Sequence, residues 1–126
     1  MKSLKKLMLG VLLASSSFFV HAGDEISAKE AAALANEKKA IIVDVREQDE
    51  WNAGHIKNAI HIPLSEIDKH IDKLQPYKEQ TIVTQCRSGK RSMQALELLK
   101  AMGYKQVYSM DGGIQAWQQQ GLSLEK

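Results

Sequence analysis

The feature that most constrains the fold is the alternation of short β-branched runs with segments of helical pattern along this 126-residue chain. A strand, a helix and a second strand in succession usually form a parallel pair, with the helix packed on the sheet. The pattern therefore predicts an α/β fold, with a mostly parallel sheet covered by helices on both faces. In such sheets, ligands bind beyond the carboxyl ends of the strands. The strands expected from the sequence are 41–45, 60–62, 81–85 and 107–110.

Capping residues and glycines mark where the helices begin and end. Ser27, followed three residues later by Glu30, predicts a helix that runs to about residue 38. Ser92 is expected to cap another helix, which should end at Gly103. Its inward residues should be Met93, Ala95, Leu96, Leu98, Leu99 and Met102. The other expected helices are 47–53 ended by Gly54, 65–74 capped by Ser65 and broken by Pro76, and 114–120.

The first 22 residues have the pattern of a cleaved secretory signal peptide. Lys2, Lys5 and Lys6 precede an apolar segment at 7–20, and Val20-His21-Ala22 offers small residues at the spacing that signal peptidase reads. An uncleaved membrane anchor is the alternative, but the apolar run is shorter than the roughly 20 residues that a spanning helix needs. We therefore expect one exported, periplasmic domain at 23–126, with no membrane association after cleavage.

Removal of the signal peptide leaves a nearly neutral chain with one cysteine. Three of the 17 Lys and Arg lie in the signal, which leaves 14 against 15 Asp and Glu and a net charge of −1. This balance argues against nucleic acid as a partner. The single cysteine excludes an intramolecular disulfide, although small secreted domains usually contain paired cysteines. The one local cluster of cations lies beside that cysteine, at Arg87, Lys90 and Arg91.

The segment after the strand 81–85 combines three features that favour an ionised sulfur at Cys86. A helix N-terminus follows it, Gly89 lets successive amides turn toward one point, and three cations lie within five residues. Each favours the thiolate over the thiol, so we expect the pKa of Cys86 to be depressed. The alternative is a buried structural cysteine beside a solvated basic loop. The cations argue against it, because they make a poor environment for a packing residue and a good cradle for an anion.

The chain resembles the single-domain rhodaneses in three segments that occur in the expected order. The segment 86–92, Cys-Arg-Ser-Gly-Lys-Arg-Ser, is similar to the active-site loop of that family. Together with the signal peptide, the resemblance extends to small periplasmic rhodaneses of Gram-negative bacteria, such as the phage-shock type. The N-terminal similarity lies in Asp44-Val45-Arg46, Glu50-Trp51, Gly54-His55-Ile56, Ala59 and Ile62-Pro63, and the C-terminal similarity in Asp111-Gly112-Gly113-Ile114 and Trp117.

This resemblance implies a five-stranded parallel sheet, whose missing strand we expect near 24–26, and a thiosulfate sulfurtransferase. Cys86 would carry sulfur as a persulfide from thiosulfate, or another persulfide, to cyanide or a thiol. Substrate would be bound by the loop residues Arg87, Ser88, Gly89, Lys90, Arg91 and Ser92. Arg91 and Arg87 would hold the sulfonate, with Lys90 at the rim, while Asp44 and Arg46 would brace the loop. A thioredoxin-like protein is a further candidate partner.

Other functions fit the sequence less well. Related phosphatases and arsenate reductases place five residues between Cys and Arg, whereas four separate Cys86 from Arg91, and no second cysteine is present to resolve a disulfide intermediate. A carrier that passes sulfur to one protein partner could use the same loop, whereas a silent interaction domain would not need a nucleophile. We expect no cofactor and no metal, because His55 and His61 lack zinc-like spacing. His55 should instead form a local structural hydrogen bond.

Overall fold

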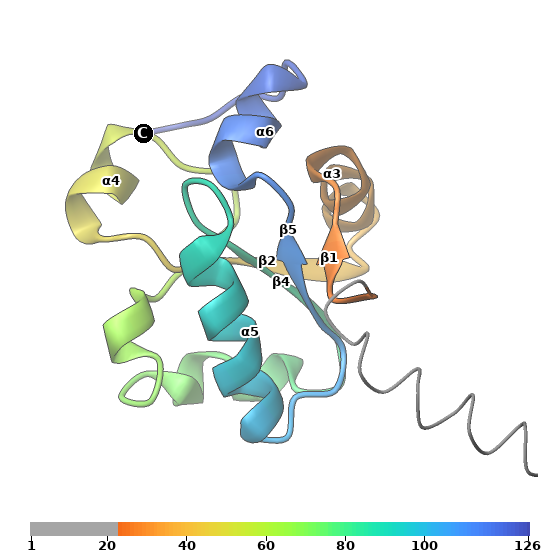
Figure 1. Cartoon of the computed structure of the whole chain (residues 1–126), viewed down its shortest axis with the longest axis vertical. Helices are drawn as coiled ribbons and strands as arrows, with labels where there is room; N and C mark the ends of the chain where they lie inside the picture. Colours follow the sequence, from red (N-terminus) through yellow and green to blue (C-terminus); the bar gives the residue numbers. More distant parts are fainter. Residues whose placement is uncertain (1–22) are drawn as a thin grey trace, which may run out of the picture.

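The computed structural model describes residues 23–126, so the predicted signal peptide at 1–22 lies outside the described residues. Five parallel strands form one sheet in the order β1-β5-β4-β2-β3. Figure 1 labels β1, β5, β4 and β2. Within the described range, no helix is long and apolar enough to cross a membrane. The strands are β1 (Glu25–Ile26), β2 (Ala40–Asp44), β3 (Ile60–His61), β4 (Thr81–Gln85) and β5 (Val107–Met110).

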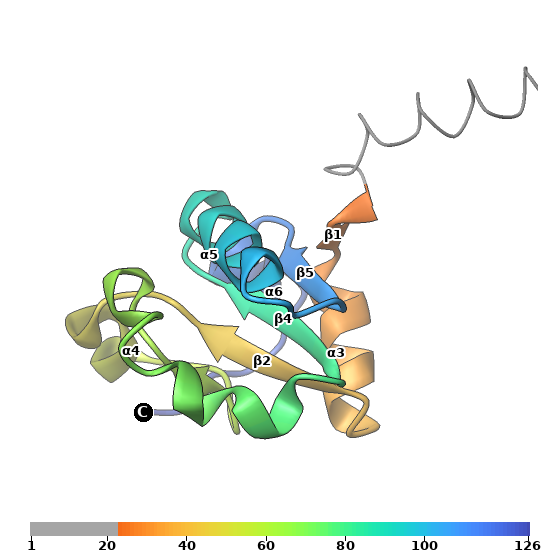
Figure 2. The same cartoon turned by 90° about the horizontal axis from the view of Figure 1, so that it is seen from below.

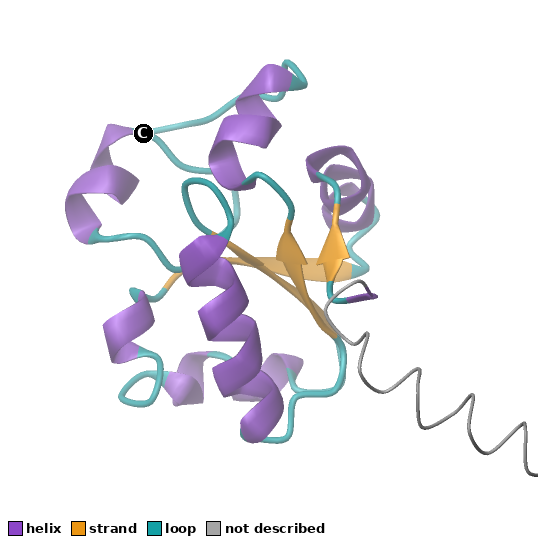
Figure 3. Cartoon of the chain, viewed as in Figure 1, coloured by secondary structure: helices purple, strands orange, loops and turns teal. Residues whose placement is uncertain are grey.

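Helices cover both faces of this sheet, as the alternating pattern predicts (Figures 2 and 3). α5 and the 3₁₀ segments pack on one face, while α3 and α6 pack together on the other. The α-helices are α3 (Ala28–Asn36), α4 (Gln48–Ala53), α5 (Lys90–Ala101) and α6 (Gly113–Gln119). The 3₁₀ segments are η2 (Leu64–Glu66), η3 (Ile71–Lys73) and η4 (Gln75–Tyr77).

The two central strands send alternate side chains into two separate cores, because successive strand residues face opposite sides of a sheet. Val43 and Ile82 pack with Leu96 of α5 in one core. Ile42 and Val83 pack with α3 and α6 in the other. This double burial explains why apolar residues follow one another at 41–43 and 82–83, instead of alternating with polar ones.

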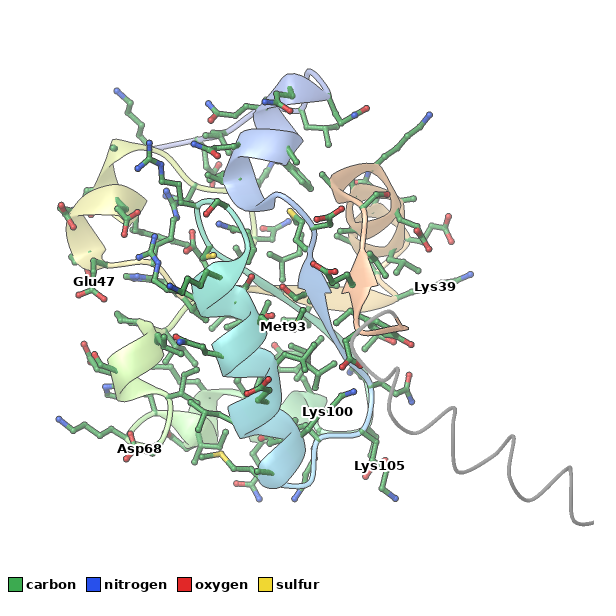
Figure 4. The ribbon with its side chains drawn as sticks, viewed as in Figure 1. Lys39, Glu47, Asp68, Met93, Lys100 and Lys105 are labelled. Atoms are coloured by element: carbon green, nitrogen blue, oxygen red, sulfur yellow. The ribbon has the colours of Figure 1, made fainter. Side chains whose placement is uncertain are left out.

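The strand that the sequence pattern missed is β1, at the position that the family resemblance implies. It spans two residues, too few to show a period, and its pairing with β5 defines it. The amide of Ser109 donates to Asp24 O at 2.7 Å, and the amide of Asp111 donates to Ile26 O at 2.8 Å. Lys100, near the C-terminal end of α5 (Figure 4), forms an ion pair with Asp24, which also ties this edge to the domain.

The predicted helix at 65–74 is wrong, because the chain forms two short 3₁₀ segments, η2 and η3, joined by turns across that range. Asp68 accepts a hydrogen bond from the amide of Lys69, which competes with helical pairing, and His70 leaves the helical region at φ −118° and ψ 25°. Ile67 and Leu74 are still fully buried, so the irregular path satisfies the same apolar positions. Pro76 does not end a helix, but lies in the first turn of η4.

Two details of the predicted helix after the cysteine loop are also wrong. The helix begins at Lys90 with Gly89 as its N-cap, so Ser92 lies inside the first turn and does not cap it. Leu98 is 43% exposed rather than inward-facing, because it lies about 200° around the helix from the buried Leu96. The end at Gly103, which has a φ of +96°, agrees with the prediction.

Candidate active site

The loop that begins at Cys86 lies at the carboxyl end of β4, between α4 and α6 and directly before α5 (Figure 1). β4 is flanked by β2 and β5, so the cysteine follows an inner strand of the sheet. A hollow of about 530 Å³ between α3 and the segment 117–123 is lined by none of the loop residues. The local geometry of the loop, and not that hollow, therefore identifies the candidate site.

The sulfur of Cys86 faces the loop amides although the residue is only 1% exposed. The Gly89 amide donates to Sγ at 3.1 Å, and the Ser92 Oγ lies 3.5 Å from Sγ. Gly89 has a φ of +121°, which side chains rarely adopt, and this turn directs its N–H back toward the sulfur. The side chain therefore borders the apolar core while its sulfur lies in a nest of donors.

The pKa of the Cys86 thiol is lowered by the balance of two opposing effects. Burial raises it most strongly, because a charged sulfur loses its hydration. The Ser92 hydroxyl and the amides of Ser92, Gly89 and Ser88 together outweigh burial, since each can donate a hydrogen bond to the thiolate. The loop thus stabilises an anion on this sulfur, as its sequence predicts.

A second buried hydroxyl, on Ser109 of β5, lies within hydrogen-bond distance of the Ser92 hydroxyl. The two Oγ atoms are 2.7 Å apart, and while Cys86 is a neutral thiol the Ser92 hydroxyl donates to Gly89 O at 3.0 Å. The Thr84 hydroxyl donates to Ser92 O at 2.8 Å. All three side chains are fully buried. Sequence reasoning missed Ser109 and Thr84, because their place in the site depends on the pairing of β4 with β5.

The start of α6 is fastened to the peptide groups of the loop. The amide of Ile114 donates to Cys86 O at 2.8 Å, and the amide of Gln115 donates to Arg87 O at 3.2 Å. Gln85 also donates to Cys86 O, at 2.9 Å, although its buried Oε1 finds no partner in the described part of the chain. Gly113 contacts the loop so closely that an added Cβ would lie 2.5 Å from both Cys86 O and Arg87 O.

The three cations of the loop differ in what they contact. Arg87 and Lys90 are exposed, and neither forms an ion pair with any residue in the range 23–126. Arg91 instead binds the Glu50 carboxylate of α4 through both terminal nitrogens, at 2.7 and 3.0 Å. This pairing raises the pKa of Arg91, chiefly through the hydrogen bonds to Glu50. Ser88, the remaining loop residue, is exposed.

Asp44 and Arg46 form a buried ion pair beside the site, with no hydrogen bond to Cys86. The guanidinium contacts both Asp44 oxygens and also donates to Gly54 O at 2.8 Å, so it ties the end of β2 to the end of α4. Asp44 pairs in register with Gln85, the residue before the cysteine. The pair therefore links the neighbouring strand to the helix that carries Glu50.

Trp51 lies between two histidine rings on the α4 side of the site. Its ring stacks on His55 at 3.7 Å and on His61 at 4.7 Å between centroids. His55 Nδ1 lies 3.1 Å from Trp51 O, which matches the local hydrogen bond expected from the sequence. Within residues 23–126, His, Cys, Asp and Glu side chains form no group of three or more that could hold a metal ion.

Comparison with known proteins identifies the class of protein that this fold and loop define. The model of the rhodanese-like domain matches residues 27–120. Thiosulfate sulfurtransferase GlpE of Coxiella burnetii is 33% identical over 93 residues, which cover 74% of this chain and 85% of that protein. A rhodanese-related protein of Thermoplasma volcanium superposes with a TM-score of 0.69 at 33% identity, covering 80% of this chain and 96% of the other.

The chain therefore belongs to the rhodanese-like family, and its curated relatives include proteins named thiosulfate sulfurtransferase. A Rhodopseudomonas palustris structure described as a possible tyrosine phosphatase is also similar, with a TM-score of 0.72 and 27% identity. It covers 81% of this chain and 84% of its own. Both the fold class and the family predicted from the sequence are confirmed.

Proposed function

We propose that this protein is a thiosulfate or persulfide sulfurtransferase that carries sulfur on Cys86. The observation that supports this most directly is the sulfur held against the Gly89 amide and near the Ser92 hydroxyl, which together lower its pKa. A thiolate, and not a thiol, is the nucleophile needed for attack on sulfur. Family membership, with relatives named thiosulfate sulfurtransferase, supports the same activity.

The proposed reaction has two steps that balance without an added redox partner. The Cys86 thiolate attacks the sulfane sulfur of thiosulfate, the S–S bond of thiosulfate breaks, and sulfite leaves with its electron pair. The sulfur that remains on Cys86 is an anionic persulfide. Cyanide or a thiol acceptor then attacks the outer sulfur, and the thiolate of Cys86 is the leaving group.

The loop residues have separate roles in this proposal. The amides of Ser88, Gly89 and Ser92 stabilise the anionic sulfur in both states, as preorganised donors do for an oxyanion. Arg87 and Lys90 are exposed and attract the sulfonate end of the donor. Arg91, expected from its sequence position to hold the sulfonate, contributes less to the attraction of the donor because its charge is paired with Glu50.

We further propose that the protein acts outside the cytoplasm after cleavage behind Ala22, in the periplasm. The support for this is the basic, apolar and small-residue order of residues 1–22. Acceptors there would be small thiols, or a thiol of a thioredoxin-like protein. Intact mass measurement of the exported protein tests the proposal, because cleavage at Ala22 leaves a chain that begins at Gly23.

Steady-state formation of thiocyanate from thiosulfate and cyanide tests the activity. We expect turnover by the natural protein and less than a few per cent of it in Cys86→Ser, with an unchanged melting temperature. Mass spectrometry after thiosulfate treatment should detect one added sulfur atom on Cys86. Added sulfur without turnover would favour the carrier alternative. The proposal would be overturned in favour of a phosphatase if Cys86 gained no sulfur and no thiocyanate formed, while the protein hydrolysed an aryl phosphate.

A further inference from the structure

Within residues 23–126, Glu50 is the one acidic side chain that forms an ion pair with the basic loop, and the proposed sulfur transfer does not use it. It lies in the first turn of α4, 41 residues before Arg91 in the sequence. Its two oxygens accept hydrogen bonds from the two terminal nitrogens of Arg91. Arg91 is the second residue of α5, at the point where the cysteine loop runs into that helix. A carboxylate from another helix therefore lies against one of the three loop cations.

Several contacts hold the Glu50 carboxylate in this position. Its Oε1 also accepts a hydrogen bond from the Glu47 amide at 3.0 Å, in the capping box of α4. The next residue, Trp51, is stacked between the rings of His55 and His61. Arg46 binds the carbonyl of Gly54 at the other end of the helix. Glu50 is therefore anchored by its helix, unlike a typical surface carboxylate on a mobile side chain.

The ion pair changes the charge that an incoming anion meets. The loop contains three cations, but the charge of Arg91 is balanced by Glu50 through a paired, two-point contact. These hydrogen bonds lower the pKa of Glu50 to about 2, so the carboxylate is ionised throughout the neutral range. Of the three loop cations, Arg87 and Lys90 are the two that form no ion pair with a described residue. Each added positive charge increases the binding free energy of a dianion more than that of a monoanion.

We propose that Glu50 is a specificity-determining positioning residue that acts through Arg91 and limits the preference of the site for dianionic donors. It fixes the Arg91 guanidinium at the edge of the loop and cancels much of its charge. Thiosulfate is therefore bound less tightly than three free cations would bind it. Organic persulfides, which carry less negative charge, therefore compete better with thiosulfate for the site. This inference rests on the proposed transfer of sulfur by Cys86.

The test is the substitution Glu50→Gln, which removes the charge but leaves an amide oxygen to accept from Glu47 and Arg91. We expect the KM for thiosulfate to fall about threefold to tenfold, while kcat changes less. The KM for the persulfide of an uncharged thiol should change less than about twofold. Asp49→Asn is the matched control, because Asp49 is the preceding, exposed carboxylate and forms no ion pair within residues 23–126.

A double-variant cycle separates action through Arg91 from direct repulsion. If Glu50 acts through Arg91, adding Glu50→Gln to Arg91→Gln should leave the KM for thiosulfate unchanged, although the same change lowers it when Arg91 is present. If Glu50→Gln lowered the KM for thiosulfate equally with and without Arg91, this inference would be overturned, because Glu50 would then repel the donor by itself. A rise in KM in the Glu50→Gln single variant would also overturn it.

Alkylation of Cys86 tests the inference even if no sulfur transfer is found. Two reagents are compared: iodoacetate, which is an anion, and iodoacetamide, which is neutral. Both react with the same thiolate, so the ratio of their rates does not depend on the pKa of the thiol. We expect Glu50→Gln to raise this ratio about threefold, and Asp49→Asn to leave it unchanged. Absence of thiocyanate in every variant would refute the proposed function alone. Normal thiocyanate formation with an unaltered ratio and KM would refute the role of Glu50 alone.

Discussion

The amide of Ile114 donates to the carbonyl of Cys86 at 2.8 Å, which fastens the start of α6 to the peptide that carries the candidate nucleophile. The approach requires that residue 113 has no side chain. Gly113 has a φ of +57°, and any Cβ there would overlap two loop carbonyls. The C-terminal Asp-Gly-Gly-Ile segment is therefore part of the candidate active site, 25 or more residues beyond the cysteine in sequence.

Gly113→Ala should destabilise the protein and disorder the cysteine loop. A left-handed φ alone costs a non-glycine residue about 1–2 kcal/mol, and the clash with Cys86 O and Arg87 O adds to that cost. Urea unfolding should show a loss of more than about 2 kcal/mol, with a larger proportional loss of thiocyanate formation. Gly121→Ala is the control, since its φ is +77° with nothing within 4 Å of a new Cβ. Equal losses in the two variants would show that the contact with the loop is unimportant.

Ser92→Ala should raise the pKa of the Cys86 thiol. Burial already favours the neutral thiol, and the Ser92 hydroxyl is foremost among the groups that oppose it. The rate of alkylation by iodoacetamide rises with pH as the thiolate forms, so the midpoint of that rise should move to higher pH. Below the midpoint, the rate should fall about tenfold, as expected for loss of a hydrogen bond to a charged group. The exposed Ser65→Ala is the control, and an unmoved midpoint in Ser92→Ala would exclude this role of the hydroxyl.

The ion pair between Glu50 and Arg91 should contribute to stability at neutral pH and lose that contribution in acid. The hydrogen bonds of Arg91 lower the pKa of Glu50 from 4.5 to about 2 in the folded protein. Stability from a depressed carboxylate pKa is complete above the unfolded value and is lost as pH falls toward the folded value. The unfolding free energy of Glu50→Gln should therefore decline less steeply between about pH 5 and pH 2.

The effect of this pair at neutral pH should be less than about 1 kcal/mol, because both side chains are partly exposed and solvent screens them. Urea unfolding at several pH values measures it, with Asp49→Asn as the comparison. If the unfolding free energies of Glu50→Gln and the natural protein changed with pH in parallel, the pair would not exist in solution.

Asp44→Asn should destabilise the fold more than any change at the exposed loop cations. Asp44 is fully buried and Arg46 is 6% exposed, so the substitution leaves a buried guanidinium without its counter-charge. Breaking a buried pair in this way costs about 3–5 kcal/mol. Thermal and urea unfolding measure the loss, and the double variant Asp44→Asn/Arg46→Gln should recover part of it. A loss of less than about 1 kcal/mol would show that water reaches Arg46.

The elements that the sequence predicted well are those whose signal lies within a few neighbouring residues. β4 and β5 match their predicted bounds, because each is a short run rich in β-branched or aromatic residues between turn residues. Ser27 caps α3 through the Glu30 amide, as the local spacing indicates. The prediction of a helix at 65–74 was wrong because packing against the rest of the domain, and not local spacing, decides the path of this segment. Its apolar spacing suits a helix, but a path of 3₁₀ segments and turns also buries Ile67 and Leu74.

The sequence by itself determined the class of fold, the family, and the cysteine loop with its glycine and its cations. Those features depend on residue types at short spacing, and short spacing sets backbone conformation and local charge. Only the tertiary structure decided what the loop contacts. Glu50 binds Arg91, Ser109 supports Ser92, and Gly113 lies against Cys86. These partners come from separate helices and strands, so their meeting depends on the order in which the strands pair, which no local pattern contains.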